Sequence, residues 1–533
     1  MSDLNNDKKE APSMERAPTP QAEIGESQKF DARQTDEAAT YLNNAEHYEP
    51  LSPEEEKKFK RKTDWILLPM LFLVATLGAI DKVALGTSAL YGLREDNALV
   101  GQQYSWLGSI LSLGALFGMF PSSWLIHRFP SAKYLCVCSI GWSACSLFLA
   151  ACHNFAGLAT LRFLMGMFEA IIVPGISLIL AGFYLKSEQP PRNALVFAAA
   201  SSVFNGFLSW AIGHIPESAP LAIWQYLFLL TGMGSIQKAL CEVPSLLTQF
   251  NPGSVSMIWS IIAFIWLPGT PMDAFFLSER EKNHAVHRLA ANKTGIVNHT
   301  WKWSQAKEAV LDPKTWLLFF FNIAINIPNG GLITFGGLII SGLGYSGVEA
   351  SLLTMPNGVV STIAAFVFSL LSAKWHNRRC LVAMIACLVP IIGTAVVYAV
   401  PRSNIGGQMV GLYFLYTYFG PYVVGIGLAQ ANTAGHTKKT VVFAILYIGY
   451  AVGNLIGPQT FRANQAPAYV GGTISMIVCY CVCIAIMGAY WVLAAWDNKK
   501  RAASAASITE TEEVIESFMD ETDFEQTGFV YTT

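Results

Sequence analysis

The feature that most constrains this chain is a series of long apolar blocks separated by short polar turns. Each block holds about 20 residues, which as a helix is the length that spans the hydrocarbon layer of a membrane. Only 14% of the residues are charged, against about 25% in ordinary soluble domains. The pattern predicts an all-α membrane protein with 12 transmembrane helices, the sixth of them interrupted: 65–88, 104–126, 133–152, 156–184, 192–214, 224–268, 315–341, 350–373, 380–400, 407–430, 440–460 and 471–496.

A polar stretch between the sixth and seventh blocks divides the chain into two six-helix halves, a layout found in secondary transporters. In this stretch Ser278 and Glu281 have the spacing of a capping box, which predicts that a helix begins there. We expect five segments: a disordered cytoplasmic tail at 1–62, a first six-helix half at 63–268, a cytoplasmic central loop at 269–314, a second six-helix half at 315–496 and a cytoplasmic tail at 497–533.

Basic residues gather on one side of the predicted helices. The clusters KKFKRK, RFPSAK, HNRR, TKK and NKKR all fall on the side of the two termini, and the opposite loops hold only Arg94, Arg402, Arg462 and Lys238. Because loops rich in Lys and Arg stay in the cytoplasm, both termini are predicted to be cytoplasmic. The plasma membrane is the expected location. A net charge of −2 gives no indication of a nucleic-acid partner.

Four ionisable residues lie inside predicted spans. Asp81 and Lys82 are in the first, and Arg162 and Glu169 are in the fourth, two helical turns apart and therefore on one face. Each costs roughly 2.5–3.5 kcal/mol at the centre of a bilayer unless it faces a bundle interior or a wet cavity. Two acids and two bases allow mutual neutralisation.

These four groups have two interpretations. In one, they are structural ion pairs that hold the first helix against the fourth. In the other, which we favour, a carboxylate changes its protonation state during a transport cycle, because burial raises the pKa of a carboxylate and a nearby cation lowers it. Arg162 or Lys82 then pairs with a substrate carboxylate while the acid is protonated.

Side-chain amides supply further candidate ligands. Asn326 and Asn329 flank Pro328 in the seventh span, where a broken helix beside a cavity can present polar groups to a small ligand. The alternative is that they hydrogen-bond neighbouring helices. Gln430 and Asn432, at the end of the tenth span, are expected to face the same cavity. The cysteines lie inside apolar blocks without metal-ligand spacing, so neither a metal nor a cofactor is expected.

These motifs resemble those of the major facilitator superfamily, and within it the anion:cation symporter branch and the fungal allantoate permease group. The resemblance covers about residues 60–500. Its strongest carriers are RFLMGMFEAIIVPG at 162–175, DPKTWLLFFFNIAINIPNGGLITFGGLII at 312–340 and NTAGHTKKT at 432–440.

The resemblance implies site roles. In that branch an acid–base pair of the first helix and the Arg and Glu of the fourth take part in proton coupling and anion binding. Carried over by motif, Asp81 and Glu169 become proton carriers, and Arg162 organises them or holds the anion. Lys82 stands where relatives often have Arg, and an ammonium cannot form the planar fork that binds a carboxylate bidentately.

The sixth span departs from the pattern of such proteins. Residues 233–253 carry Lys238, Glu242 and two prolines between the apolar runs WQYLFLLTG and SVSMIWSIIAFIWLP. Neither run alone reaches the ~20 residues that a span needs, and removing the intervening residues restores one helix. We interpret them as an aberrant insertion from a retained intron. The alternative is a genuine insertion in an outer loop.

The sequence and the resemblance together predict a proton-coupled symporter that imports a small organic anion by alternating access. Allantoate, ureidosuccinate, nicotinate and related carboxylates or vitamins are the substrates that the resemblance implies. Besides the anion and protons, the expected partner is the lipid bilayer, with the protein acting as a monomer. No nucleophile–base arrangement points to an enzyme. Two alternatives stay open: a transporter-like nutrient sensor, and an inactive isoform caused by the retained intron.

Overall fold

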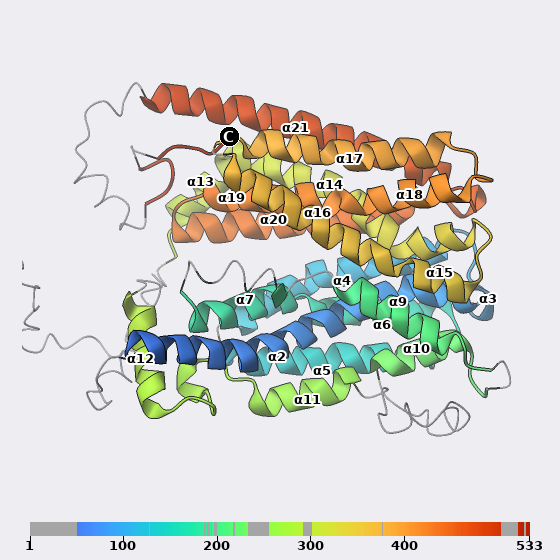
Figure 1. Ribbon diagram of the computed structural model, residues 1–533, viewed down its shortest axis with the longest axis horizontal. Helices are drawn as coiled ribbons and strands as arrows, with labels where there is room; N and C mark the ends of the chain where they lie inside the picture. Colours follow the sequence, from blue (N-terminus) through green and yellow to red (C-terminus); the bar gives the residue numbers. More distant parts are fainter. Residues whose placement is uncertain are drawn as a thin grey trace, which may run out of the picture. The chain divides into compact units, whose positions relative to one another are not determined.

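The computed structural model describes most of the chain after residue 50. The described residues are 51–126, 128–185, 188, 192, 195–196, 200–216, 219–232, 255–291, 301–375, 377–502, 521–526 and 529–533. Their regular secondary structure is entirely helical (Figure 1). The first 50 residues of the predicted tail and the suspected insertion at 233–253, with Lys238 and Glu242, lie outside the described residues.

The helices of the first half follow the predicted spans. They are α2 (Pro53–Ser88), η1 (Ala89–Tyr91), α3 (Leu93–Asp96), α4 (Gln103–Leu125), α5 (Ser131–Leu149), α6 (Phe155–Glu169), α7 (Ile172–Phe183), α9 (Ala200–Ile212), α10 (Ile223–Gly232) and α11 (Val255–Trp266). The predicted fourth span is thus divided into α6 and α7, and the sixth into α10 and α11.

The central stretch contains η3 (Pro271–Asp273), α12 (Glu279–Ala291) and α13 (Trp303–Leu311). The predicted capping box is confirmed: the Ser278 amide donates to Glu281 Oε2 at 2.8 Å, and the Glu281 amide donates to Ser278 Oγ at 3.3 Å. Ion pairs tie α12 to the beginning of α2, among them Lys62 with Glu281 at 2.7 Å.

The second half is made of longer helices. They are α14 (Pro313–Ser341), α15 (Gly347–Leu353), α16 (Met355–Lys374), α17 (Arg379–Ala399), α18 (Ile405–Leu415), η4 (Tyr416–Tyr418), α19 (Phe419–Ala431), α20 (His436–Ile456), η5 (Gly457–Thr460), η6 (Ala463–Gln465) and α21 (Val470–Ala502). Ten segments of the described chain are long and apolar enough to cross a membrane. The predicted fifth and sixth spans are not among them, because their described helices are short.

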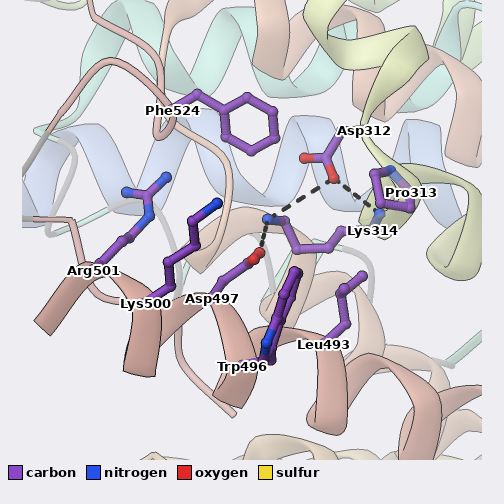
Figure 2. A pocket seen from close by; sticks show the side chains of 9 residues that line it. All are labelled: Asp312, Pro313, Lys314, Leu493, Trp496, Asp497, Lys500, Arg501 and Phe524. Atoms are coloured by element: carbon purple, nitrogen blue, oxygen red, sulfur yellow. Dashed lines mark hydrogen bonds and ion pairs between the residues drawn. The ribbon is translucent and has the colours of Figure 1, made fainter. Parts of the chain in front are cut away.

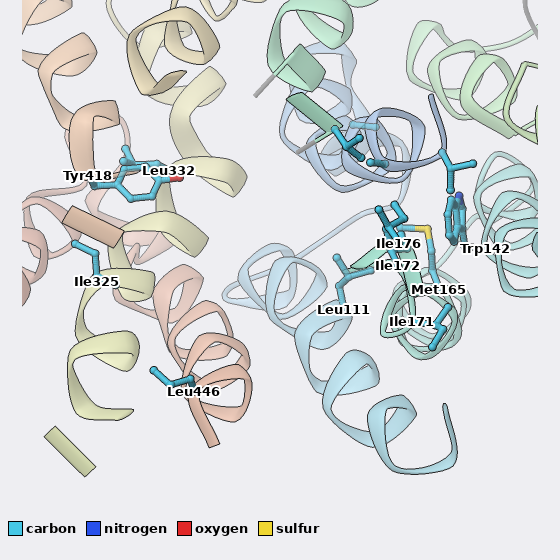
Figure 3. Close-up of a cluster of buried hydrophobic side chains, with 14 of the residues drawn as sticks. Leu111, Trp142, Met165, Ile171, Ile172, Ile176, Ile325, Leu332, Tyr418 and Leu446 are labelled. Carbon is cyan, nitrogen blue, oxygen red and sulfur yellow. The ribbon is translucent and has the colours of Figure 1, made fainter. Parts of the chain in front are cut away.

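The buried apolar side chains form one core with members in both halves. In Figure 3 one group of apolar side chains, with Leu111, Trp142 and Ile176, comes from the first half, and a second group, with Ile325 and Leu446, comes from the second. The two groups lie on separate sets of helices.

Glycine stripes allow the closest helix contacts within the halves. A Cβ on Gly166 of α6 would lie 2.0 Å from a backbone oxygen of α4, and one on Gly114 of α4 would lie 2.0 Å from a backbone oxygen of α6. In the second half a Cβ on Gly449 or Gly453 of α20, or on Gly457 at the start of η5, would meet the backbone of α14 within 3 Å. Small residues let helix backbones approach in this way in membranes.

Contacts between the halves gather where α2 and α14 end. Gly86 of α2 lies against backbone oxygens of α14, and Tyr104 Oη of α4 donates to the Thr334 carbonyl of α14 at 2.7 Å. Tyr91 Oη and Ser351 Oγ are 2.9 Å apart. In Figure 1, α2 leads from beside α12 on the left to α3 on the right, and α14 leads from α13 on the left to α15 on the right, so the two helices run in the same direction. We call the face at which both begin the termini face, and the face that holds these contacts the opposite face.

Candidate functional site

The charged residues of the first and fourth predicted spans come together in the first half. Lys82 Nζ of α2 lies 3.5 Å from Glu169 Oε1 of α6. The two side chains are 17% and 22% exposed, so the pair is neither sealed in a core nor on an open surface. An acid and a base of these two helices therefore pair, a contact that both interpretations of the four charges allow.

A residue of the second half completes this pair. Lys82 Nζ donates to Tyr450 Oη of α20 at 3.0 Å, and the same ammonium lies 5.3 Å from the centroid of the Tyr450 ring. The Tyr447 and Tyr422 rings lie beside that of Tyr450, with centroids 5.8 and 6.4 Å away. Lys82 therefore links the two halves, with an anionic partner on one side and an aromatic cluster on the other.

Asp81 and Arg162 form a more deeply buried set than the Lys82–Glu169 pair. Asp81 is 1% exposed and accepts a hydrogen bond from Ser146 Oγ of α5 at 2.9 Å. Arg162 is 2% exposed, and its guanidinium donates to the carbonyls of Asp81 and Leu107, each at 3.4 Å. Arg162 thus holds three helices of the first half together through their backbones.

The position of Glu169 depends on a break in the fourth predicted span. Pro174 has no N–H to donate to the Ala170 carbonyl, and its ring crowds that carbonyl, which favours a kink or break in the helix there. The structure accordingly ends α6 at Glu169 and begins α7 at Ile172. The carboxylate sits at the last residue before the break, which is where a small change in helix geometry would move it most.

The asparagines of α14 lie near this pair and bond mainly to one another. Asn326 Nδ2 donates to Asn322 Oδ1 at 3.0 Å, and Asn329 Nδ2 donates to Asn326 Oδ1 at 3.2 Å and to Asn454 Oδ1 of α20 at 3.1 Å. Asn454 Nδ2 in turn donates to the Tyr450 carbonyl at 2.9 Å. A buried amide chain therefore runs from α14 to the helix that carries the Lys82 partner.

Gln430 and Asn432 lie elsewhere. Gln430 is exposed at the end of α19. Asn432 is buried against the last residues of the chain, with Nδ2 donating to Tyr490 Oη at 2.9 Å and to the Thr532 carbonyl at 2.8 Å. The structure therefore does not bring these two amides together with Glu169, and their predicted place in one cavity gains no support from the geometry.

Sequence reasoning missed Tyr450 and Tyr447. Both lie in the block FAILYIGYAVGN, where aromatic residues three positions apart are usual packing residues. A weak signal was present, because the same stretch of sequence carries Asn454 and has a glycine at every fourth position from Gly449 to Gly457. Only the fold places this face of α20 against α2.

The described residues were also searched for side-chain groups that could hold a metal ion. Within the described ranges no group of three His, Cys, Asp or Glu side chains could hold a metal ion, and the nine cysteines found there are unpaired.

Two helical bundles with a shared, partly exposed charge cluster define a multi-pass membrane transporter of small molecules. Comparison with known proteins identifies the group. A family model described as Major Facilitator Superfamily matches residues 71–237. The chain is 37% identical over 482 residues to the MFS-type transporter cnsL of Penicillium expansum, covering 90% of this chain and 89% of that one.

Two further likenesses support this assignment. The chain is 30% identical over 513 residues to the allantoate permease of Saccharomyces cerevisiae, covering 93% and 90% of the two chains. Among solved structures, the inward-open xylose transporter XylE from E. coli matches with a TM-score of 0.55 at 13% identity, covering 80% of this chain and 95% of that one. This chain belongs to the major facilitator superfamily, and its relatives include the allantoate permease, as its motifs indicated.

Proposed function

We propose that this transporter is a proton-coupled symporter that imports a small organic anion. The observation that carries the proposal is the Lys82–Glu169 pair, in which one cation between the two halves is shared by a carboxylate and a tyrosine. A substrate carboxylate has the same charge as Glu169 and can take its place beside Lys82. The allantoate permease among the relatives supports an organic anion as the substrate class.

In this cycle Glu169 and the anion compete for Lys82. Protonation of Glu169 from the outside removes its charge and frees the ammonium to bind the incoming anion. When the site opens to the cytosol, loss of the proton restores the Lys82–Glu169 pair and displaces the anion. One proton then accompanies one monoanion, so uptake in this ratio is electroneutral.

The other charged groups take supporting roles in the proposal. Glu169 is better placed than Asp81 to exchange a proton, because its side chain is 22% exposed whereas Asp81 is 1% exposed. Lys82 is better placed than Arg162 to hold the anion, because the hydrogen bonds of Arg162 go to backbone carbonyls. Asn326 and Asn329 would orient the aromatic side of the site through Asn454.

The proposed orientation follows from the basic clusters on the termini face. Since Lys and Arg favour the cytoplasmic side, we assign the termini face to the cytoplasm and the opposite face to the outside, with the plasma membrane as the proposed location. The hydrogen bonds between the halves would then close the outer side, an inward-facing arrangement. Because both halves and every residue of the Lys82–Glu169–Tyr450 site belong to one chain, a monomer is sufficient for the proposed transport.

An uptake screen tests the proposal. Cells expressing the chain, with and without residues 233–253, are given labelled allantoate, ureidosuccinate and nicotinate while the external pH is varied. We expect uptake of at least one anion to rise with an inward proton gradient and to lose that dependence in Glu169→Gln. Gradient-independent uptake by the unmodified chain would contradict proton coupling, and saturable binding without uptake would favour a sensor.

A further inference from the structure

The last residues of the chain form a segment that is docked on the second half. We call the described residues 521–526 and 529–533 the C-terminal strap. Asp523 and Tyr531 are both 0% exposed, and Tyr531 Oη donates to Asp523 Oδ2 at 2.7 Å. Lys438, at the beginning of α20, lies 2.7 Å from Asp523 Oδ1. The strap is therefore anchored by a buried charge cluster on the termini face.

Hydrogen bonds from backbone amides of the strap to side chains of the second half fix its position. The Thr532 amide donates to Asn432 Oδ1, and the Tyr531 amide donates to Asn498 Oδ1, each at 2.8 Å. Arg501, in the last turn of α21, donates to Tyr531 Oη at 3.1 Å. These contacts explain why Asn432 is buried, and they fix where the rest of the strap lies.

One strap residue forms the wall of a cavity. Phe524 stands on one side of a cavity of ≈ 350 Å³ whose other walls include Lys314 from the start of α14 and Lys500 and Arg501 from the end of α21 (Figure 2). Phe524 is 45% exposed, although its neighbours Asp523 and Thr522 are fully buried. The strap thus presents an aromatic ring to an open polar compartment.

An apolar groove continues from this compartment along the membrane-spanning part of α14 and α21. The groove, of ≈ 520 Å³, is lined by Leu317 of α14 and by Ala489 and Val492 of α21, and it shares Leu493 and Trp496 with the polar compartment. Val492 is 71% exposed, as expected of a residue that faces lipid. Together the two spaces suit a molecule with a polar head and an apolar chain.

The charges of the compartment favour an anionic head. Its carboxylates are already bound, since Lys314 Nζ lies 2.8 Å from Asp497 and 3.9 Å from Asp312. Lys500 has no ion pair within the described part of the chain, and its ammonium lies 5.9 Å from the Trp496 ring centroid. Arg501 adds a second positive charge. Basic residues just cytoplasmic of a transmembrane helix attract anionic lipids.

We propose that this seam binds an anionic phospholipid of the cytoplasmic leaflet, with its phosphate at Lys500 and Arg501 and an acyl chain in the groove beside Ala489. The head would pack against Phe524 and stabilise the docked strap. The proposal takes the termini face as cytoplasmic, but it does not depend on the substrate or on proton coupling.

Lipid retention measured by mass spectrometry tests the site. Purified full-length protein is titrated with phosphatidylserine, with phosphatidylcholine and with inorganic phosphate. We expect one phosphatidylserine to bind in preference to phosphatidylcholine, and Lys500→Gln to weaken it about fivefold, the effect of one basic residue near a membrane surface. Lys374→Gln is the control, because Lys374 is also exposed in the last turn of its helix but lies outside the cavity.

A second variant and a second readout separate the alternatives. Ala489→Trp fills the groove without changing charge, and it should weaken phosphatidylserine binding while leaving hydrogen exchange of the strap in lipid-free protein unchanged. At a lipid concentration that half-saturates the wild type, phosphatidylserine should slow exchange of the strap in the wild type and slow it less in either variant. The proposal would be overturned if both phospholipids bound equally well. It would also be overturned if inorganic phosphate displaced the lipid and Ala489→Trp had no effect on lipid binding.

Discussion

The sharpest test of the proposed cycle is the effect of Glu169→Gln on anion binding. If Glu169 and the anion compete for Lys82, removing the carboxylate charge should strengthen binding of the anion at neutral pH. The variant should bind equally well at acidic and neutral pH, whereas the wild type should bind well only when acid protonates Glu169. A purely structural ion pair predicts the opposite sign, because its loss would loosen the site.

The expected size of the effect follows from the geometry. At the 3.5 Å separation of Lys82 and Glu169, two unit charges attract by about 1 kcal/mol at the dielectric constant of water and by about 5 kcal/mol at an effective value of about 20. Side chains that are 17% and 22% exposed lie between these limits. We therefore expect the anion to bind at least about tenfold more tightly, which corresponds to about 1.4 kcal/mol.

The assay is equilibrium binding of the labelled anion selected by the uptake screen, measured on purified protein at acidic and neutral pH. Glu95→Gln is the control, because Glu95 is an exposed carboxylate outside the site. Weaker binding by Glu169→Gln, or a pH dependence that persists in this variant, would refute the competition between Glu169 and substrate.

Three further predictions concern stability. Gly166→Ala should destabilise the protein by about 1–3 kcal/mol through overpacking, because its Cβ would lie 2.0 Å from a backbone oxygen. Gly427→Ala, whose Cβ would have no atom within 4 Å, should instead stabilise its helix by about 0.5–1 kcal/mol. Thermal unfolding of the two variants measures the difference. Burial raises the pKa of Glu281, but hydrogen bonds from Lys62 and a backbone amide lower it overall. The ionised Glu281 therefore stabilises the folded protein at pH values above the ordinary carboxyl pKa, and this stabilisation is lost as the pH falls through the lowered pKa. The protection factors of α12 amides, which correct for the slower intrinsic exchange in acid, should therefore fall as the pH is lowered, and fall less in Glu281→Gln. Tyr531→Phe removes a hydroxyl that bonds two charged groups and should speed proteolysis of the strap about tenfold, as expected for a loss of about 1.4 kcal/mol.

The sequence was informative wherever a local rule applied. The capping box at Ser278 and the ends of most apolar blocks depend on residues a few positions apart, and the structure confirms them. The approach of the first and fourth predicted spans was also accessible, since charges inside a membrane need partners and the two acids and two bases offered them.

The particular pairing was not accessible. Which of the bases Lys82 and Arg162 pairs with which acid depends on how the two helices are rotated about their axes and on the break near Pro174. The contribution of Tyr450 depends on contacts across 368 positions of sequence. The surroundings of Asn432 were not accessible for the same reason, because its partners include Thr532, 100 residues away.

The amino-acid sequence by itself determined that this chain enters a membrane, where its helices begin, and that a few charges must be sheltered inside. These properties follow from the free-energy cost of exposing polar groups to hydrocarbon, and this cost depends on the residues of each segment alone. Only the tertiary structure decided which charged residues pair with each other, and that Phe524 of the strap forms one wall of a compartment. Those outcomes depend on how helices distant in sequence pack, and packing is a property of the whole fold.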